Sequence, residues 1–178
     1  MTVEEFIVAM PKVALDVRLE GIFRRDTLMV IADQNEVAES TKNFLYWMDL
    51  LDNPEYDRLE EIAEQVCQWL QEPDDLTRLV YDAGVILSRQ NVKYAEIAIN
   101  PSLFMLNGMA FDDFMAALND GRERAERGWK VQMRWILTIA REEPRRADEI
   151  VRWATSATGR KGGVVGLGLY GDASAQPV

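Results

Sequence analysis

Four short, mostly apolar runs punctuate the chain, and each is about the length of a β-strand. They are KVALDVRL (Lys12–Leu19), VKYAEIAIN (Val92–Asn100), KVQMRWILTIA (Lys130–Ala140) and GVVGLGLYG (Gly163–Gly171). Strands buried on both faces of a parallel sheet are nearly continuous apolar runs of this kind. The pattern therefore predicts four strands.

The longer stretches between these runs have apolar residues three or four positions apart, which is typical of amphipathic helices. We expect helices over Pro54–Gln71, Leu76–Gln90 and Phe111–Arg127. A further helix should run through RRADEIVRWATSAT, with Pro144 in its first turn.

Capping residues refine the ends of two of these helices. Asp74 or Asp75 is a candidate N-terminal cap for the helix over Leu76–Gln90, and Asp112 is one for the helix that follows. Gly128 is a candidate C-terminal stop for that second helix.

Alternation of strands and helices favours parallel strands joined by crossover helices. No Ser/Gly-rich linker divides the sequence, so residues 1–178 are expected to form a single domain. A complete (β/α)₈ barrel has eight strands and typically about 250 residues. We therefore predict an α/β fold that is an incomplete TIM-type barrel, a half-barrel of about four parallel strands.

A half-barrel has unpaired strands at both edges, and such edges invite pairing with another chain. The segment Val164–Leu169 is the expected edge at the end of the chain. We expect a homo-oligomer, or a partner chain that supplies the missing strands.

Charge and hydropathy exclude some partners. The 178 residues are 48 % hydrophobic and carry a formal net charge of -10, so nucleic acid and anionic membranes are disfavoured. No apolar run approaches the roughly 20 residues that span a bilayer. We expect neither a nucleic-acid nor a membrane partner.

The cysteine content and the opening segment suggest a compartment. Cys67, the single cysteine, has helical spacing and is expected to be a structural thiol in a reducing environment. The opening MTVEEFIVAM contains two glutamates and no basic region, so it does not resemble a signal peptide. A cytoplasmic protein is expected.

Charged residues occupy alternate positions at the end of the first strand-like run, namely Asp16, Arg18 and Glu20. Alternate side chains of a strand point to one face. We expect these three groups to lie together at the carboxyl end of the strand.

The four runs also carry motifs. MPKVALDVRLEGIFRRDTL resembles the P-K-x-E-L-H-x-H-L-[DE]-G-[AS]-x-R-P-x-T-L of the adenosine deaminase family, and YAEIAINPSLF resembles its Y-x-E-x-R-x-S-P-x-L. VQMRWILTIAREEP is similar to V-R-x-I-L-x-x-x-R-x-x-P, and GGVVGLGLYGD to G-V-V-G-x-D-L-A-G-D-E. The motifs occur in the family's order over nearly the whole chain.

This resemblance implies a metal-dependent barrel of the amidohydrolase superfamily that replaces the 6-amino group of adenosine with oxygen from water. A divalent metal, usually zinc, activates the water in that chemistry. In the family, two metal ligands are the histidines of the first-strand H-x-H, and further ligands lie on later strands. Gly171 matches the family glycine whose backbone N–H contacts the purine ring.

The sequence departs from the family at the positions that carry this chemistry. Asp16 and Arg18 stand at the two H-x-H positions, and the chain contains no histidine. Asp16 could ligate a metal through oxygen, whereas the guanidinium of Arg18 has no free lone pair. We predict an Asp16–Arg18–Glu20 ion cluster in place of the metal. Use of Arg18 to bind an anion or small molecule, and an altered metal site, are the alternatives.

The departures continue along the other three strands. Ala98 stands at the arginine of the second motif, Glu142 at the histidine that usually follows Arg141, and Gly168 at the aspartate of the fourth. Without imidazole, no zinc site of the family type and no general base tuned near neutral pH is available.

The function that follows is an adenosine-deaminase-like protein without catalytic or metal-binding residues, acting as a non-catalytic binding or assembly subunit. No cofactor is expected, and Gly171, Arg18 and Glu20 are the candidate contacts for a purine-like ligand. The alternative is one half of a split, metal-dependent purine deaminase whose partner chain brings the histidines.

Overall fold

The computed structural model describes residues 2–105 and 108–171. Its four strands form one parallel sheet in the order β1-β2-β3-β4. They are β1 (Lys12–Arg18), β2 (Val92–Ile99), β3 (Gln132–Ala140) and β4 (Val164–Tyr170). All four predicted strands are confirmed, and Val164–Leu169 lies in an edge strand as predicted.

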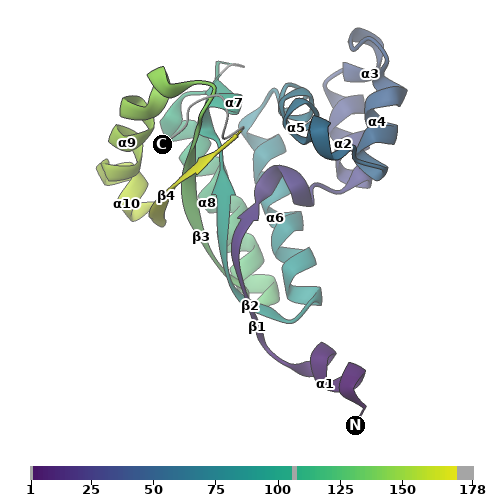
Figure 1. Ribbon diagram of the computed structural model, residues 1–178, viewed down its shortest axis with the longest axis vertical. Coiled ribbons are helices and arrows are strands. Elements are labelled where there is room, and N and C mark those ends of the chain that lie inside the picture. Colours follow the sequence, from purple (N-terminus) through teal and green to yellow (C-terminus); the bar gives the residue numbers. More distant parts are fainter. Residues whose placement is uncertain (1, 106–107, 172–178) are drawn as a thin grey trace.

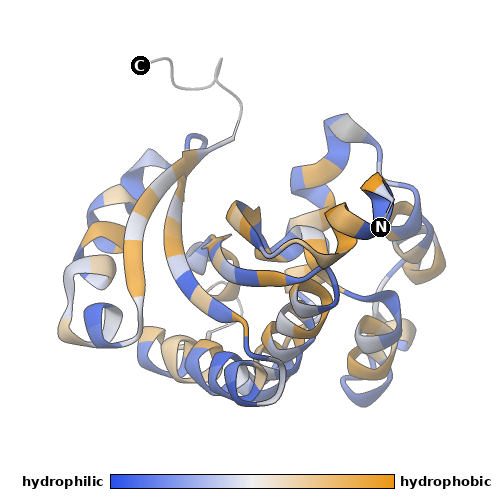
Figure 2. Ribbon diagram, turned by 90° about the horizontal axis from the view of Figure 1, so that it is seen from below, coloured by the Kyte–Doolittle hydropathy of each residue, from blue (hydrophilic) through white to orange (hydrophobic). Residues whose placement is uncertain are grey.

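Helices cover only the convex side of the curved sheet (Figure 2). These are α6 (Pro73–Arg89), α8 (Phe111–Trp129), α9 (Ala147–Thr155) and α10 (Ala157–Lys161). Trp135 of β3 and Ile97 of β2 are fully buried on this side. Burial of such large side chains against the helices is the main favourable term in forming this layer. The concave side carries no helix layer, which is the geometry of a partial (β/α) barrel.

A helical insertion connects β1 to α6 and lies to one side of the sheet (Figure 1). It contains η1 (Leu19–Ile22), α2 (Arg25–Gln34), α3 (Val37–Ser40), α4 (Phe44–Asp52), η2 (Tyr56–Arg58) and α5 (Leu59–Cys67). The helix predicted over Pro54–Gln71 is thus shorter, because it forms only as η2 followed by α5.

Three short elements complete the chain. They are α1 (Val3–Ala9) before β1, α7 (Pro101–Met105) after β2 and η3 (Pro144–Arg146) before α9. Pro144 takes the first position of η3, and the single helix predicted through RRADEIVRWATSAT forms as η3 and α9, with a break at Ser156 before α10. No helix within the described ranges is long and apolar enough to cross a membrane.

Neither predicted cap stands at the N-cap position of α6 or α8 itself. Glu72 caps α6, while Asp75 acts from inside the first turn by accepting hydrogen bonds from the backbone N–H groups of Gln71 and Glu72, both at 3.1 Å. Ala110 precedes α8, and Asp112 lies in its first turn, where a carboxylate favours the positive end of the helix dipole.

Gly128 does not end α8 either. The helix continues to Trp129, and Lys130 follows with a left-handed φ of 56°. A residue in this conformation directly after the last turn is a common way to end a helix.

β1 contains a bulge that changes which side chains share a face. Ala14 pairs with Ala95 and Val17 with Ile97, so β1 has one more residue than β2 between the two pairs. Asp16 lies in this bulge with φ 55°, and Glu20 lies beyond the strand in η1. The expectation that Asp16, Arg18 and Glu20 share one strand face is therefore wrong.

Close packing of α6 against α8 supplies a test of the fold. A Cβ atom at Gly121 of α8 would lie 2.5 Å from the backbone oxygen of Thr77 and 2.7 Å from the Cβ of Val80. We expect Gly121→Ala to lower the free energy of unfolding by about 1–3 kcal/mol, as overpacking does. Urea unfolding of the purified chain measures this change.

Gly128→Ala is the matched control in the same helix, since nothing lies within 4 Å of a Cβ placed there. Replacing an exposed helical glycine by alanine should raise the free energy of unfolding by about 0.5–1 kcal/mol. Equal effects of the two substitutions would contradict the packing of α6 on α8.

Candidate functional site

The carboxyl ends of the strands bring together side chains from both edges of the sheet. Arg18 is the last residue of β1, and Tyr170 is the last residue of β4. The strong curvature of the sheet places the Cζ atom of Arg18 4.4 Å from the centre of the Tyr170 ring. This is a cation–π contact of a kind worth roughly 0.5–2 kcal/mol.

Two carboxylates hold the guanidinium of Arg18. Its two terminal nitrogens contact the two carboxylate oxygens of Glu60 in α5, at 2.6 and 3.4 Å. Its Nε lies 3.6 Å from Oε2 of Glu20. Burial acts to lower the pKa of Arg18, but the hydrogen bond that Arg18 donates to Glu60 and the negative charges of Glu20 and Glu60 raise it overall. Arg18 is a permanently charged centre of this network.

Glu20 is the buried member of the network. Its side chain is 2 % exposed, and one carboxylate oxygen accepts a hydrogen bond from the backbone N–H of Asn100 at 3.4 Å. The other oxygen has no hydrogen bond among the described residues, and faces Arg18. Burial raises the pKa of Glu20 above its ordinary value, while the charge of Arg18 acts to lower it.

Asn100 connects the buried carboxylate to the far edge of the sheet. Its side-chain amide donates a hydrogen bond to the Tyr170 hydroxyl at 2.6 Å, and its side-chain oxygen accepts one from the backbone N–H of Ser102 at 3.0 Å. Burial raises the pKa of Tyr170 above its usual range. Tyr170 is therefore a neutral phenol whose ring and hydroxyl are both held in place.

Asp16 stays outside this network. It is exposed in the bulge of β1, and its side chain makes no ion pair or hydrogen bond within residues 2–105 and 108–171. The predicted Asp16–Arg18–Glu20 cluster is thus corrected to one formed by Arg18, Glu20 and Glu60.

Three members of the network, Glu60, Asn100 and Tyr170, were not predicted from the sequence. Glu60 lies 42 residues after Arg18 in a helix, and no local pattern connects the two. Tyr170 carried a signal, because it stands at the alanine of the family's D-L-A-G motif, where a large aromatic ring is a marked change.

Gly171 lies beside this network, directly after Tyr170. Its φ of 100° is in a region that favours glycine, and a Cβ at this position would collide with the carboxylate of Glu142. The glycine therefore permits both the turn and the approach of Glu142. Its contact with a ligand stays a prediction.

A pocket of about 210 Å³ opens next to Arg18 and Glu20, between η1 and α5. Phe23, Leu51 and Ile62 form much of its apolar wall. Small-molecule sites are typically about 300–1,000 Å³, so this pocket is smaller than a usual ligand site.

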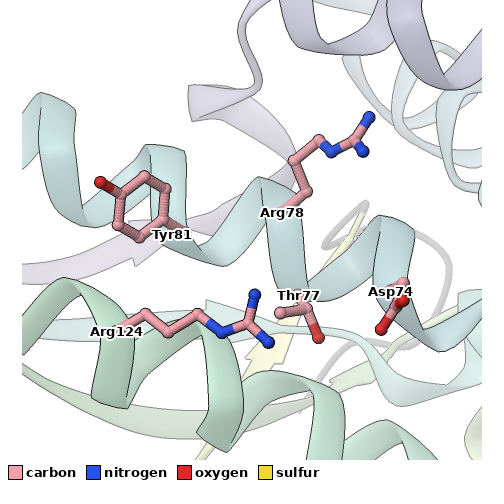
Figure 3. A pocket seen from close by; sticks show the side chains of 5 residues that line it. All are labelled: Asp74, Thr77, Arg78, Tyr81 and Arg124. Carbon is pink, nitrogen blue, oxygen red and sulfur yellow. The ribbon is translucent and has the colours of Figure 1, made fainter.

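A second hollow, of about 270 Å³, lies on the helical surface away from the strand ends (Figure 3). Its lining residues are Asp74, Thr77, Arg78, Tyr81 and Arg124. The guanidinium groups of Arg78 and Arg124 point in different directions, and each has its own partner, Gln34 and Asp120 respectively. Nothing in this hollow converges on a shared ligand.

The family model described as adenosine deaminase matches residues 11–178. The chain belongs to the adenosine deaminase family.

Two relatives show how much of the family this chain covers. It is 28 % identical over 137 residues to an adenosine deaminase of Shewanella woodyi, covering 75 % of this chain and 41 % of the relative. It is 28 % identical over 167 residues to an aminodeoxyfutalosine deaminase of Streptomyces avermitilis, covering 93 % and 47 %. The chain therefore spans about half the length of the curated relatives it matches.

Solved structures agree with the half-barrel. A zinc-bound amidohydrolase from Burkhoderia ambifaria superimposes with a TM-score of 0.83 at 26 % identity, over 99 % of this chain and 49 % of that one. An N6-methyl-AMP deaminase from Arabidopsis thaliana gives a TM-score of 0.77 at 24 % identity, over 94 % and 51 %. The predicted fold, an incomplete TIM-type barrel, is confirmed.

The strand ends of this family member do not fit the family's metal. The full sequence contains no histidine, and the part of the chain that the structure describes holds no group of three or more His, Cys, Asp or Glu residues that could ligate an ion. At the first-strand position the Arg18 guanidinium offers only donors, and a cation needs acceptors. The carboxylates of Glu20 and Glu60 are already paired with that guanidinium.

Glu20 makes the stability of the protein depend on pH with a definite sign. Because its pKa is raised in the folded state, the fold binds the Glu20 proton more tightly than the unfolded chain does. The stabilisation that comes from this tighter proton binding is complete below the ordinary pKa of 4.5. It is lost as the pH rises through the pKa of Glu20 in the folded state. Relative to Glu20→Gln, the natural chain should lose free energy of unfolding as the pH rises from 4.5, measured by urea unfolding.

Glu61→Gln is a control of opposite sign. Arg58 lowers the pKa of Glu61 through a hydrogen bond, so the contribution of Glu61 is present above pH 4.5 and is lost on acidification. The same pH trend for both variants would contradict the burial of Glu20.

Proposed function

We propose that this member of the adenosine deaminase family has lost metal-dependent purine deamination and is a non-catalytic binding or assembly subunit. The observation that carries the proposal is Arg18, which stands at a metal-ligand position of the first-strand motif and is held there by Glu20 and Glu60. The buried thiol of Cys67, the single cysteine, fits a reducing compartment, and we place the protein in the cytoplasm.

Electrostatics support the loss of the metal. Two unit charges 4 Å apart interact by about 4 kcal/mol at the effective dielectric of a protein surface, and a divalent ion doubles that energy. A zinc ion next to Arg18 would meet this repulsion and would also have to compete for both carboxylates. Arg18 therefore acts as a built-in cation that replaces the metal and keeps it out.

Binding of a small ligand at the same end of the sheet is the remaining role that the residues support. A purine-like molecule that entered the pocket between η1 and α5 would contact Arg18 and Glu20. Contact with Gly171 would require Glu142 to move from its place against that glycine. These three residues are our proposed ligand contacts.

A split deaminase is the second candidate, because the chain spans about half the length of its relatives. In that case another chain brings the histidines, and Arg18 has to leave the network when the two halves join. The two candidates differ in whether zinc ever binds.

Zinc analysis of the purified chain tests whether this chain alone has kept metal chemistry. After incubation with excess Zn²⁺ and dialysis, we expect far less than one zinc per chain by elemental analysis, and no deamination of adenosine above buffer. The reason is the missing imidazoles and the charge of Arg18.

Stoichiometric zinc or purine turnover by the chain alone would overturn the loss of metal chemistry. Arg18→Leu is the matched variant, since it removes the positive charge without adding an atom that can ligate a metal. Zinc that binds to Arg18→Leu but not to the natural chain would support the blocking role of Arg18. Zinc at one equivalent in both would contradict it.

A further inference from the structure

The first helix is exposed on all sides. α1 projects from the end of the sheet where the strands begin, and none of its residues is buried (Figure 1). Val3, Phe6, Ile7 and Val8 are between 49 % and 75 % exposed. A helix of 7 residues without packing partners is only marginally stable in water, so these side chains point to a missing partner.

α1 is nevertheless well defined by its own hydrogen bonds. Thr2 and Glu5 form a reciprocal capping box, with distances of 2.8 and 3.1 Å. At the other end, the side chain of Asn91 donates a hydrogen bond to the backbone oxygen of Ala9 at 2.6 Å. The sequence thus encodes a helix at this position and leaves its apolar side chains uncovered.

The second uncovered surface is the convex face of β4. Val165, Leu167 and Leu169 are 54 %, 45 % and 54 % exposed. Leu167 pairs with Leu137, which is fully buried beneath the helices, so this face of β4 is the one that helices should cover. Helices α9 and α10 contact β4 but leave these three side chains exposed.

The free edge of β4 is also unprotected. Its 7 residues include no charged residue and no proline, the devices that usually guard a sheet edge. In a (β/α) barrel, the helix before the next strand covers such a face, and that next strand pairs with the edge.

This chain contains such a helix–strand unit. Only Met10 and Pro11 separate α1 from β1, and β1 is the other free edge of the sheet. If α1 of a second copy packs on β4, the short connection brings β1 of that copy to the β4 edge. Two copies related by a two-fold axis can make this contact reciprocally. Each free edge strand, β1 and β4, then pairs with an edge strand of the other copy.

The charges of the two surfaces also favour a second copy of this chain as the partner. α1 carries Glu4 and Glu5 and no basic residue, whereas α10, which leads into β4, carries exposed Arg160 and Lys161. The acidic helix and the basic approach to β4 belong to the same sequence. A second copy therefore offers both apolar and ionic complementarity.

We propose that two copies of this chain associate reciprocally, α1 of each packing on the exposed face of β4 of the other, so that the two half-barrels close one barrel. The contact uses surfaces away from Arg18, and it stands whether or not that site binds a ligand.

Sedimentation equilibrium of the full chain tests the proposal, with an expected mass of twice 20.3 kDa. Ile7→Lys and Leu167→Lys should each shift the population to monomer, because each places a charge in the apolar contact. Leu45→Lys is the control, since Leu45 is 76 % exposed on α4, outside both surfaces, and its variant should stay dimeric. Circular dichroism checks that the variants keep their fold. A natural chain that sediments as a monomer at every concentration would overturn the proposal, as would a dimer that survives both substitutions.

Cross-linking tests the reciprocal arrangement directly. Cys67 is buried, so a short bismaleimide should react with introduced cysteines. A mixture of Ile7→Cys and Leu167→Cys chains should give a cross-linked product with one chain of each kind, and neither variant should cross-link when alone. Equal cross-linking of the separate variants would contradict the contact of α1 with β4.

Discussion

The contact on which the candidate site depends is the ion pair of Arg18 with the buried carboxylate of Glu20. A buried carboxylate without a partner costs several kcal/mol, and this one faces Arg18 with an oxygen that has no hydrogen bond among the described residues. The same guanidinium reaches Glu60 in α5 and the ring of Tyr170 in β4. One side chain therefore joins the first strand, the helical insertion and the last described strand at the end of the sheet where family chemistry occurs.

The shape of the sheet makes this contact possible. β1 and β4 are the opposite edges of the sheet, and only a strongly curved sheet lets their side chains meet. Gly168 contributes, since a Cβ there would lie 2.9 Å from the side chain of Thr138 in the neighbouring strand. The position where the family motif has an aspartate thus serves here to bring β4 close to β3. Loss of a chemical group and a gain in packing occur at the same residue.

Much of the fold could be predicted from the sequence, because burial imposes its periodicity directly on the residues. The apolar runs predicted all four strands, and the spacing in Leu76–Gln90 and Phe111–Arg127 predicted α6 and α8. Helix ends were predicted less well. Asp75 caps from inside the helix, and α8 continues past Gly128, since a capping pattern does not specify which turn it serves.

The site could be predicted only in part, for a different physical reason. Arg18 and Glu20 are close in sequence, so their pairing could be inferred. The bulge at Asp16 could not, because alternation of residue types does not reveal a left-handed residue within a strand. Glu60 and the packing of Tyr170 depend on contacts between distant segments, which no local pattern encodes.

The most direct test of the ion pair is a double-mutant cycle with Arg18→Met and Glu20→Gln, followed by urea unfolding near neutral pH. If Arg18 compensates the buried carboxylate, the two substitutions should be coupled by about 1–3 kcal/mol, with the double variant more stable than the sum of the single effects predicts. Effects that add to within about 0.5 kcal/mol would contradict the account, because Glu20 would then be stable in the core without Arg18.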